Sequence, residues 1–338
     1  MRHAADVVAG LQREIEAVLH PLLAGGPVTA LVDFPNYPNV GDSAIYLGQL
    51  AMLRSLGIPA PRFICDFRTY DRRALARAVG DGIILLTGGG SFGDLWPTAQ
   101  ECREDILRGF PRHRVVQLPQ TLHFSSAGVL DRARRVVNAH QRFVLLVRDH
   151  RSLEMARREF AGEVRLCPDM AFALGMLRRA APPSRRAVWL SRSDKERAIS
   201  PTPDAGTVVA DWLDEPSTLL RRTNYALMGA TLRLPPRALW RRLLIATYRP
   251  LARQRLERGM ALLSAGDVII TDRLHGHILA LLLGIPHVLL DDANGKLSSF
   301  HETWTYDVSG VRLARDPVEA LDLATRTRAQ STAGFPTA

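Results

Sequence analysis

The sequence has little cysteine and no long apolar run. Its three cysteines lie far apart and none belongs to a CxxC pair, so we expect neither a disulfide framework nor a zinc site. The longest apolar run, residues 278–288, is broken by Pro286 and His287 and is too short to cross a bilayer. The first 26 residues carry acids at helical spacing, so no signal peptide is expected. These absences predict a soluble cytoplasmic protein.

Acidic residues are nearly missing from one segment. Residues 219–258 contain ten arginines and one acid, Glu257, and therefore carry nine of the ten net positive charges. Such a patch attracts phosphate groups. Around Trp240, apolar residues recur at helical spacing opposite arginines, which is typical of a helix lying peripherally on a membrane and equally of a solvated surface helix. No nucleic-acid-binding motif accompanies the charge, so nucleic acid is not an expected partner.

The standard glycine-rich nucleotide motifs are also absent. Three glycines follow the apolar run 82–87, but they form neither GxGxxG nor a Walker loop. Glycines at this point allow the backbone to approach a ligand closely. A tight turn without a ligand explains them equally well.

Strand-like and helix-like segments alternate along nearly the whole chain. This alternation predicts an α/β fold with parallel sheets covered by helices on both faces. The proline-containing stretch 180–186 indicates a linker, so we expect one domain over 1–181 and a second over 182–338. Strands are expected at 28–34, 82–87, 114–118, 143–148, 164–167, 187–191, 207–210, 268–271 and 287–290, and helices at 43–56, 71–79, 131–140, 151–160 and 275–283.

Ligands of open parallel sheets bind beyond the carboxyl ends of the strands, so polar residues at those ends are the site candidates. Asp42 or Ser43 could cap a helix expected from about Ala44, and capping alone would explain Asp42 without a ligand. The neighbours Arg148 and Asp149 are interpreted as a structural salt bridge with a helix cap. The first half of the chain supplies these candidates for lining a cleft: Asn39, Asp42, Gly89, Gly90, Ser91, Asp94, Gln120 and His123.

The strongest cluster is Thr271-Asp-Arg-Leu-His-Gly-His277, between an apolar strand and an apolar helix. His275 and His277 suggest a metal, but the fixed cation Arg273 would repel one, and zinc motifs use other spacings. An anion site with an ionisable histidine fits better. Two other strand exits add cations: Arg192 and Lys195 in one, and Lys296 in the other.

Eight stretches, in this order and over about residues 33–304, resemble the polysaccharide pyruvyl transferase family: NVGDSAIY, TGGGSFGDLW, QLPQTLHF, VRDHRSLE, PDMAF, SRSDKE, TDRLHGHILALLLGIP and DDANGKLSSF. The resemblance implies two Rossmann-like domains facing a cleft, in the layout of GT-B glycosyltransferases. It also implies phosphoenolpyruvate as donor and a sugar diol as acceptor, and it leaves open whether the sugar is linked to a lipid or to a nucleotide. The products would be a cyclic pyruvate ketal and phosphate. The arginine-rich segment 219–258 matches no motif of the family.

The resemblance also implies roles for single residues. Donor binding falls to the segment Arg273, Leu274 and His275, and to Arg192, with Lys296 as a supporting cation. Ketal formation needs a proton on the donor's methylene carbon, and we expect His275 to supply it because histidine titrates near neutrality. Asp42 and Asp94 are the candidate bases, and no step calls for a metal or redox cofactor. The main alternative is a GT-B-like glycosyltransferase that uses a nucleotide-sugar.

Overall fold

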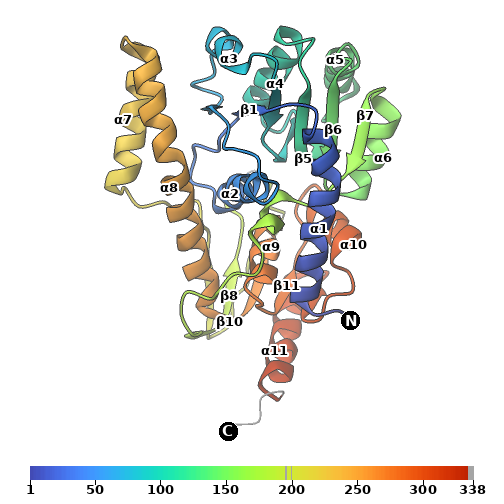
Figure 1. Cartoon of the computed structure of the whole chain (residues 1–338). Coiled ribbons are helices and arrows are strands. Elements are labelled where there is room, and N and C mark those ends of the chain that lie inside the picture. The colour runs from blue at the N-terminus through green and yellow to red at the C-terminus, as the bar shows by residue number, and fades with distance from the viewer. Residues whose placement is uncertain (195, 199, 334–338) are drawn as a thin grey trace.

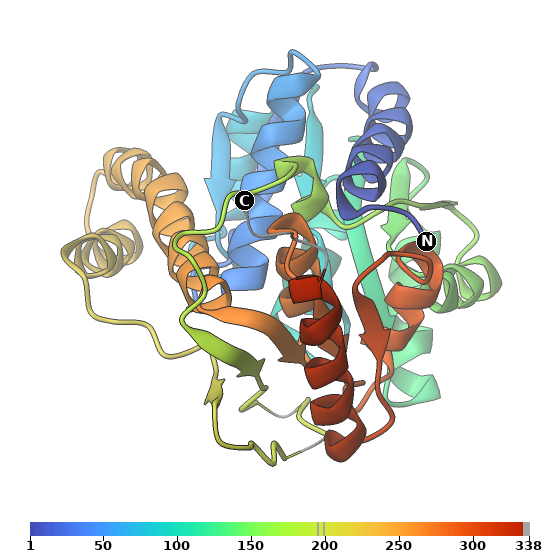
Figure 2. The same ribbon diagram turned by 90° about the horizontal axis from the view of Figure 1, so that it is seen from below.

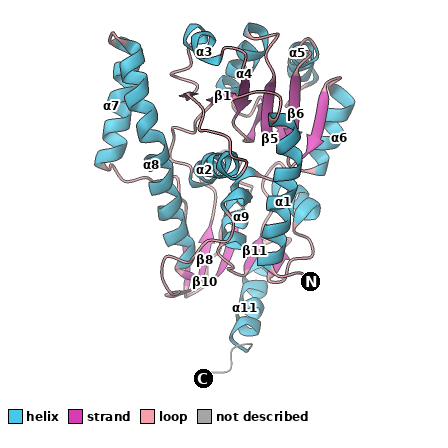
Figure 3. Cartoon of the chain, in the orientation of Figure 1, coloured by secondary structure: helices cyan, strands magenta, loops and turns pink. Residues whose placement is uncertain are grey.

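The computed structural model describes residues 1–194, 196–198 and 200–333, with the backbone alone for 329–333. It contains two parallel sheets, one above the other in Figure 1 and coloured magenta in Figure 3. This arrangement confirms the predicted α/β fold with two Rossmann-like halves. The first sheet has the order β2 (Phe63–Cys65), β1 (Val28–Val32), β3 (Ile83–Leu86), β5 (Val115–His123), β6 (Phe143–Val147) and β7 (Glu163–Leu166), and β4 (Gly89–Gly93) pairs with β5. The second has the order β12 (Val311–Leu313), β11 (His287–Leu289), β10 (Gly266–Thr271), β8 (Arg185–Leu190) and β9 (Thr207–Ala210).

Helices connect the strands and cover the sheets. The described ones are α1 (Ala4–Leu23), α2 (Val40–Ser55), α3 (Arg72–Val79), α4 (Pro97–Gly109), α5 (Ala127–Asn138), α6 (His150–Glu159), the 3-10 turn η1 (Met170–Leu174), α7 (Leu219–Arg233), α8 (Arg237–Ser264), α9 (Leu274–Leu282), α10 (Lys296–Trp304) and α11 (Pro317–Ala333). Every strand predicted from the sequence is present. The sequence analysis missed β2 and β12, which are three residues long, and β4, whose glycines do not favour a strand.

One hydrophobic core joins the two sheets. In β1, Leu31 faces this shared core, while Ala30 and Val32 face a second core beneath α3, α4, α5 and α6. The shared core also receives Val188 and Ile269 from the second sheet, together with apolar residues of α1, α2, α8 and α9. A smaller core lies under α11 on the far face of the second sheet. The alternation of side chains along a strand is what allows central strands such as β1 and β10 to contribute to two cores.

The start of α2 differs from the sequence prediction. The helix begins at Val40, and its cap is Asn39, whose side-chain oxygen accepts a hydrogen bond from Gly41 N at 2.9 Å. The prediction that Asp42 or Ser43 caps this helix is therefore wrong, because an amide oxygen three residues upstream already satisfies the exposed N–H. Asp42 lies inside the first turn instead, and its carboxylate is available for other contacts.

The two halves are also joined at the N-terminus. Arg2 forms an ion pair with Asp307, at 2.7 Å, and a backbone bridge with Val308. Helix α1 packs against both η1 and α9. The chain passes from the first sheet to the second between Leu166 and Arg185, and the predicted boundary at 181/182 falls in this passage.

Helices α7 and α8 form a hairpin whose upper part stands away from the sheets (Figures 1 and 2). Its base is fixed by Arg255, which is fully buried. Arg255 donates to Glu215 from Nε at 2.6 Å and to the carbonyl oxygen of Pro35 at 3.0 Å. The hairpin is thereby tied to the exits of β9 and β1. Among the described residues, no helix is long and apolar enough to cross a membrane.

We predict that Arg255→Met destabilises the fold. The substitution keeps an apolar stem but leaves the Glu215 carboxylate buried without its closest ion-pair partner, with Arg221 at 3.4 Å as the remaining ion pair in the described part of the chain. Removing one partner of a buried ion pair lowers the free energy of unfolding by about 3 kcal/mol, measurable by urea denaturation. Replacing both partners, in Arg255→Met with Glu215→Leu, should recover most of the loss. The exposed neighbour Arg253→Met is the control, and an equal effect there would contradict the prediction.

Candidate active site

The carboxyl ends of the two sheets face each other, and the candidate site lies where they meet. The first turn of α2, after β1, packs closely on the start of α9, after β10. A Cβ atom placed on Gly41 would lie 2.5 Å from Cβ of His275, so only glycine fits at this position. Strand exits of both sheets therefore contribute to one site, as the sequence analysis expected from the strand-end rule.

His275 faces a buried ion pair of the first sheet. Its Nε2 lies 3.4 Å from Oδ2 of Asp169, which is within ion-pair range but lacks the geometry of a hydrogen bond. The same carboxylate oxygen accepts a hydrogen bond from Arg148 Nη1 at 2.6 Å. Burial opposes ionisation of Asp169, yet the neighbouring His275 and Arg148 hold its pKa well below the usual range. Asp169 therefore carries a negative charge beside the imidazole.

Asp42 lies beside the same histidine. Burial raises the pKa of Asp42 above its ordinary value, and the nearby charges of His275 and Arg148 oppose that rise. A carboxylate whose pKa is shifted towards neutrality is better suited to accept a proton at pH 7. Asp42 and His275 come from different sheets, so folding alone brings the predicted acid and one predicted base together.

The glycine-rich segment forms β4 and packs tightly on β5. A Cβ on Gly93 would lie 1.7 Å from the carbonyl oxygen of His123. The segment is held by Gln120, whose Oε1 accepts from Ser91 N and whose Nε2 donates to Thr87 O, both at 2.9 Å. The N–H of Ser91 is therefore engaged rather than open to a ligand.

Gly90 is the glycine of this segment nearest to the site cations. A Cβ there would lie 3.3 Å from Arg148 Nη2 and 3.5 Å from Lys296 Nζ. Gly89, beside it, comes close to Asp42, since its Cβ would lie 3.7 Å from Oδ1. Gly89 and Gly90 thus border both the acid–base pair and the cations.

The three predicted donor-binding cations are buried or nearly so, and carboxylates hold all of them. Arg273 contacts Oδ2 of Asp211 at 2.7 Å. Arg192 donates to both oxygens of Asp194, at 2.9 and 3.0 Å. Glu196 pairs with Lys296 and also with Arg192.

Glu196 is the carboxylate shared between two of these cations. Burial opposes its ionisation, but Lys296 and Arg192 lower its pKa. Such ion pairs offset part of the cost of burying the cations. They also mean that an anionic ligand must compete with, or displace, protein carboxylates. Lys195, of the same loop, lies outside the described residues.

Several buried polar atoms at the strand exits have no hydrogen-bond partner within the described part of the chain. They are Thr87 Oγ1 after β3, Arg273 Nε and His275 Nε2 after β10, and Asp292 Oδ2 after β11. Buried polar atoms are nearly always satisfied. Their occurrence at the ends of strands from both sheets indicates a place where a polar ligand completes the hydrogen bonding.

Two predicted residues lie elsewhere. The two carboxylate oxygens of Asp94 accept from the backbone N–H of Ser125, at 3.0 and 3.2 Å, and one of them also accepts from the Ser125 hydroxyl. Burial opposes ionisation of Asp94, but the hydrogen bonds from the Ser125 hydroxyl and N–H lower its pKa. His123 pairs with Gly93 in the β4–β5 register. Both lie at the far end of β4, so Asp42 is the better placed of the two candidate bases.

His277 points away from His275, into the core. Its ring bonds His287 at 2.7 Å and Thr305 at 2.9 Å, and it is fully buried. Residues two apart on a helix face different directions, which is why the two histidines separate.

Sequence reasoning missed Arg148 and Asp169 as site residues. The predicted Arg148–Asp149 salt bridge is wrong, because Arg148 pairs with Asp169 across the sheet, while Asp149 caps α6 and accepts from Ser152 N at 2.8 Å. The cap prediction for Asp149 is confirmed. The signal that could have found Asp169 is its position directly after a strand, next to Pro168.

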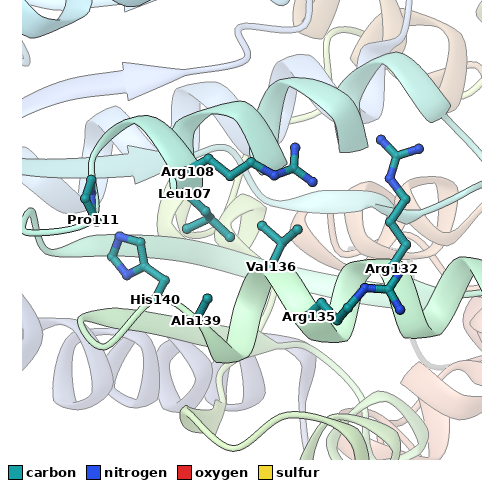
Figure 4. Close-up of a pocket in the computed structure, with 8 residues that line it drawn as sticks. All are labelled: Leu107, Arg108, Pro111, Arg132, Arg135, Val136, Ala139 and His140. Atoms are coloured by element: carbon teal, nitrogen blue, oxygen red, sulfur yellow. The ribbon is translucent and has the colours of Figure 1, made fainter.

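The pocket drawn in Figure 4 lies away from this site. It has a volume of about 480 Å³ and lies between the C-terminal ends of α4 and α5. His140, in its wall, precedes β6, so the pocket is at the amino ends of the strands. A second hollow, of about 330 Å³, lies between α6 and α10 and includes Gly295, the neighbour of Lys296.

Two opposed parallel sheets with buried arginines, a lysine and a histidine between them define a GT-B-like α/β protein with a cation-rich site. The chain belongs to the polysaccharide pyruvyl transferase family, whose sequence profile matches residues 39–294. Membership implies a transferase with a pyruvyl donor and a sugar acceptor.

Named relatives agree with this assignment. Pyruvyl transferase 1 of Schizosaccharomyces pombe is 29% identical over 88% of this chain and 75% of its own length. EpsO of Bacillus subtilis is 30% identical over 83% of this chain and 86% of its own length. A crystal structure of an uncharacterised Klebsiella pneumoniae protein has a TM-score of 0.59 and 15% identity, covering 90% of this chain and 98% of that one. This last similarity supports the fold alone.

Asp272 gives a pH-dependent prediction. It links the exits of β10 and β8 by accepting a hydrogen bond from Arg192 N at 2.9 Å, and burial raises its pKa to about 6. The unfolded chain releases this proton near pH 4, at the ordinary pKa of about 3.9. The folded protein therefore retains a proton that the unfolded chain loses, and Asp272 lowers stability as the pH rises from about 4 to about 6.

Asp272→Asn keeps the acceptor oxygen and removes this titration. We expect the variant to gain, relative to the original protein, on the order of 2 kcal/mol of unfolding free energy between pH 4 and pH 7. Urea denaturation at the two pH values measures the gain. The exposed Asp81→Asn serves as control. A difference between variant and original protein that is the same at both pH values would refute the assignment.

Proposed function

We propose that this protein transfers the pyruvyl unit of phosphoenolpyruvate to two hydroxyl groups of a sugar in a polysaccharide precursor or glycoconjugate. The products are a cyclic ketal and inorganic phosphate. The observation that carries the proposal is the meeting of His275 and Asp42, one from each sheet, beside a cluster of buried cations. Family membership supports the pyruvyl donor and sugar acceptor.

Phosphoenolpyruvate combines a carboxylate and a phosphate on a small carbon frame. Burying it requires cationic hydrogen-bond donors, because unpaired buried charge is very costly. Arg273, Arg192 and Lys296 supply such donors, with Leu274 beside them in the chain. In the structure, these cationic side chains contact the carboxylates of Asp211, Asp194 and Glu196. The carboxylate and phosphate of phosphoenolpyruvate would replace part of those contacts.

The reaction adds a proton to the methylene carbon of the donor, which leaves the adjacent C2 with cation-like character. One sugar hydroxyl then forms a C2–O bond, the bond from C2 to the phosphate oxygen breaks, and the second hydroxyl forms the other C2–O bond. One of the two hydroxyl protons makes up for the proton added to the methylene carbon, which has become a methyl group. The other hydroxyl proton leaves with phosphate. We assign the proton delivery to His275, which Asp169 supports electrostatically.

Asp42 is assigned as the base that receives a hydroxyl proton. Its raised pKa and its place beside His275 suit that role. After one transfer, Asp42 holds a proton and His275 has lost one, so a proton passing between the two restores both groups. Asn39 and the glycines at 89 and 90 border this position. The cytoplasmic location inferred from the sequence remains a prediction.

The alternative, a glycosyltransferase using a nucleotide-sugar, suits the same overall fold. The compact set of cations and the family assignment favour phosphoenolpyruvate. The two are separated by the released product, which is phosphate from phosphoenolpyruvate but a nucleoside diphosphate from a nucleotide-sugar.

We predict that the protein releases phosphate from phosphoenolpyruvate when it is given a matching acceptor. A panel of lipid-linked and nucleotide-linked sugars, tested one at a time, identifies that acceptor. His275→Ala should lower this rate by about 10²–10⁴-fold, the usual contribution of a general acid. Circular dichroism checks that the variant is folded, and His20→Ala, on the exposed face of α1, is the control. Near-normal turnover in His275→Ala would remove this residue from the mechanism. Nucleoside diphosphate as the product would overturn the proposed reaction.

Arg273→Ala should weaken donor binding. A hydrogen bond to a charged group contributes about 1.5–3 kcal/mol, so the dissociation constant for phosphoenolpyruvate should rise by about 10- to 100-fold. Isothermal titration without acceptor measures it. Arg157→Ala, on the exposed surface of α6, controls for the loss of one positive charge. An unchanged dissociation constant in Arg273→Ala would contradict its role.

A further inference from the structure

The tip of the α7–α8 hairpin is a surface that the proposed reaction does not use. We define the hairpin tip as residues 232–243. Every residue from 232 to 239 is exposed. Four leucines of the tip are between 42% and 49% exposed: Leu232, Leu234, Leu239 and Leu243. Scattered single leucines are common on protein surfaces, but four within twelve residues at one projecting end form a patch.

The same tip is strongly basic. Arg233, Arg237 and Arg242 are exposed, and within the described part of the chain none of the three is paired with a carboxylate. The sequence from 219 to 256 contains no acid at all. Three further arginines of the hairpin behave differently, because Arg255, Arg221 and Arg258 are held by Glu215 or by backbone carbonyls near the base. Arg222, Arg249 and Arg253, lower on the hairpin, are exposed as well, so what distinguishes the tip is that its unpaired arginines lie beside exposed leucines.

The hairpin is firmly built although its tip is exposed. A hydrogen bond of 2.7 Å between the buried side chains of Asn224 and Thr247 joins the two helices. Below the tip, Leu244, Tyr248 and Leu251 are fully buried in the protein. Near the tip, the Arg241 guanidinium stacks over Phe63 at 5.4 Å. The exposure of the leucines is therefore a property of a fixed, projecting element (Figures 1 and 2).

We propose that the hairpin tip binds the surface of an anionic phospholipid membrane. The leucines would enter the interfacial layer, while the arginines contact headgroup phosphates. The leucines lie on both helices and on the turn between them, so they surround a convex end. A convex, apolar and basic end fits a bilayer interface. A protein partner that recognises a short segment usually offers a groove instead.

The proposed contact would hold the protein at a surface that carries lipid-linked sugars. Helix α8 is 28 residues long and runs from the tip to β10, directly before Arg273. At about 1.5 Å per residue it spans roughly 40 Å. The inference does not depend on the proposed reaction, since membrane binding is measured without donor or acceptor.

The test is sedimentation of the full chain with phosphatidylcholine vesicles, with or without phosphatidylglycerol, at low and high salt. We expect binding only to the vesicles that contain phosphatidylglycerol, weakened by salt. Arg233→Gln, Arg237→Gln and Arg242→Gln together should lower the affinity by roughly a hundredfold, at about fivefold per arginine. The matched control removes three exposed arginines elsewhere, in Arg13→Gln, Arg112→Gln and Arg157→Gln, and should bind nearly as well as the original protein.

A leucine pair separates insertion from simple charge attraction. Leu234→Ser with Leu239→Ser should lower the affinity at least about tenfold. Leu313→Ser with Val318→Ser changes two exposed apolar residues elsewhere and should have little effect. Circular dichroism confirms that each variant is folded.

Four outcomes would overturn the proposal. The first is no binding to anionic vesicles at low salt. The second is vesicle binding that the tip arginines do not affect, which would place the membrane contact on another surface of the protein. The third is an equal loss in the arginine control, which would show that net charge alone is responsible. The fourth is an unchanged affinity in the tip leucine variant, which would reduce the contact to attraction by any polyanion.

Discussion

The neutralisation of buried charge governs the centre of this protein. Asp169 is fully buried, and it is kept ionised by Arg148 from its own sheet and by His275 from the other. Because an unpaired charge inside a protein is very costly, each of these groups depends on the other two. The close packing of His275 on Gly41 fixes the distance at which the two sheets meet. The rest of the site is arranged around this contact.

The same constraint explains the surrounding ion pairs. Arg273, Arg192 and Lys296 come from three exits of the second sheet, and each is held by a carboxylate. A group of cations this close would repel one another without such partners. An anionic ligand bound here would therefore exchange places with protein carboxylates. A small donor with two anionic groups is suited to that exchange because it can replace two carboxylates at once. A ligand with a single negative charge would replace only one of them.

The α7–α8 hairpin differs from the site, because part of its positive charge is exposed and has no carboxylate partner among the described residues. At its base, Arg255 is buried and paired with Glu215, and the helices are locked to the strand exits of both sheets. Towards its tip, arginines and leucines are exposed together. The base therefore stabilises the fold, while the tip is accessible to an external surface. A single arginine-rich segment of the sequence thus contains residues with two different physical roles, which composition alone cannot separate.

The sequence by itself determined the alternation of strands and helices, the candidate residues at strand ends, and the family. Local pattern carries this information, because side-chain periodicity and short motifs depend on neighbours in the chain. Only the tertiary structure decided that Arg148 pairs with Asp169 rather than with Asp149, that Asn39 caps α2, and that His277 turns into the core while His275 faces Asp169. The Arg148–Asp169 pair and the orientations of the two histidines depend on which strand ends the fold brings together, and on the requirement that each buried charge have a partner. The Asn39 cap depends on the backbone conformation at the start of α2.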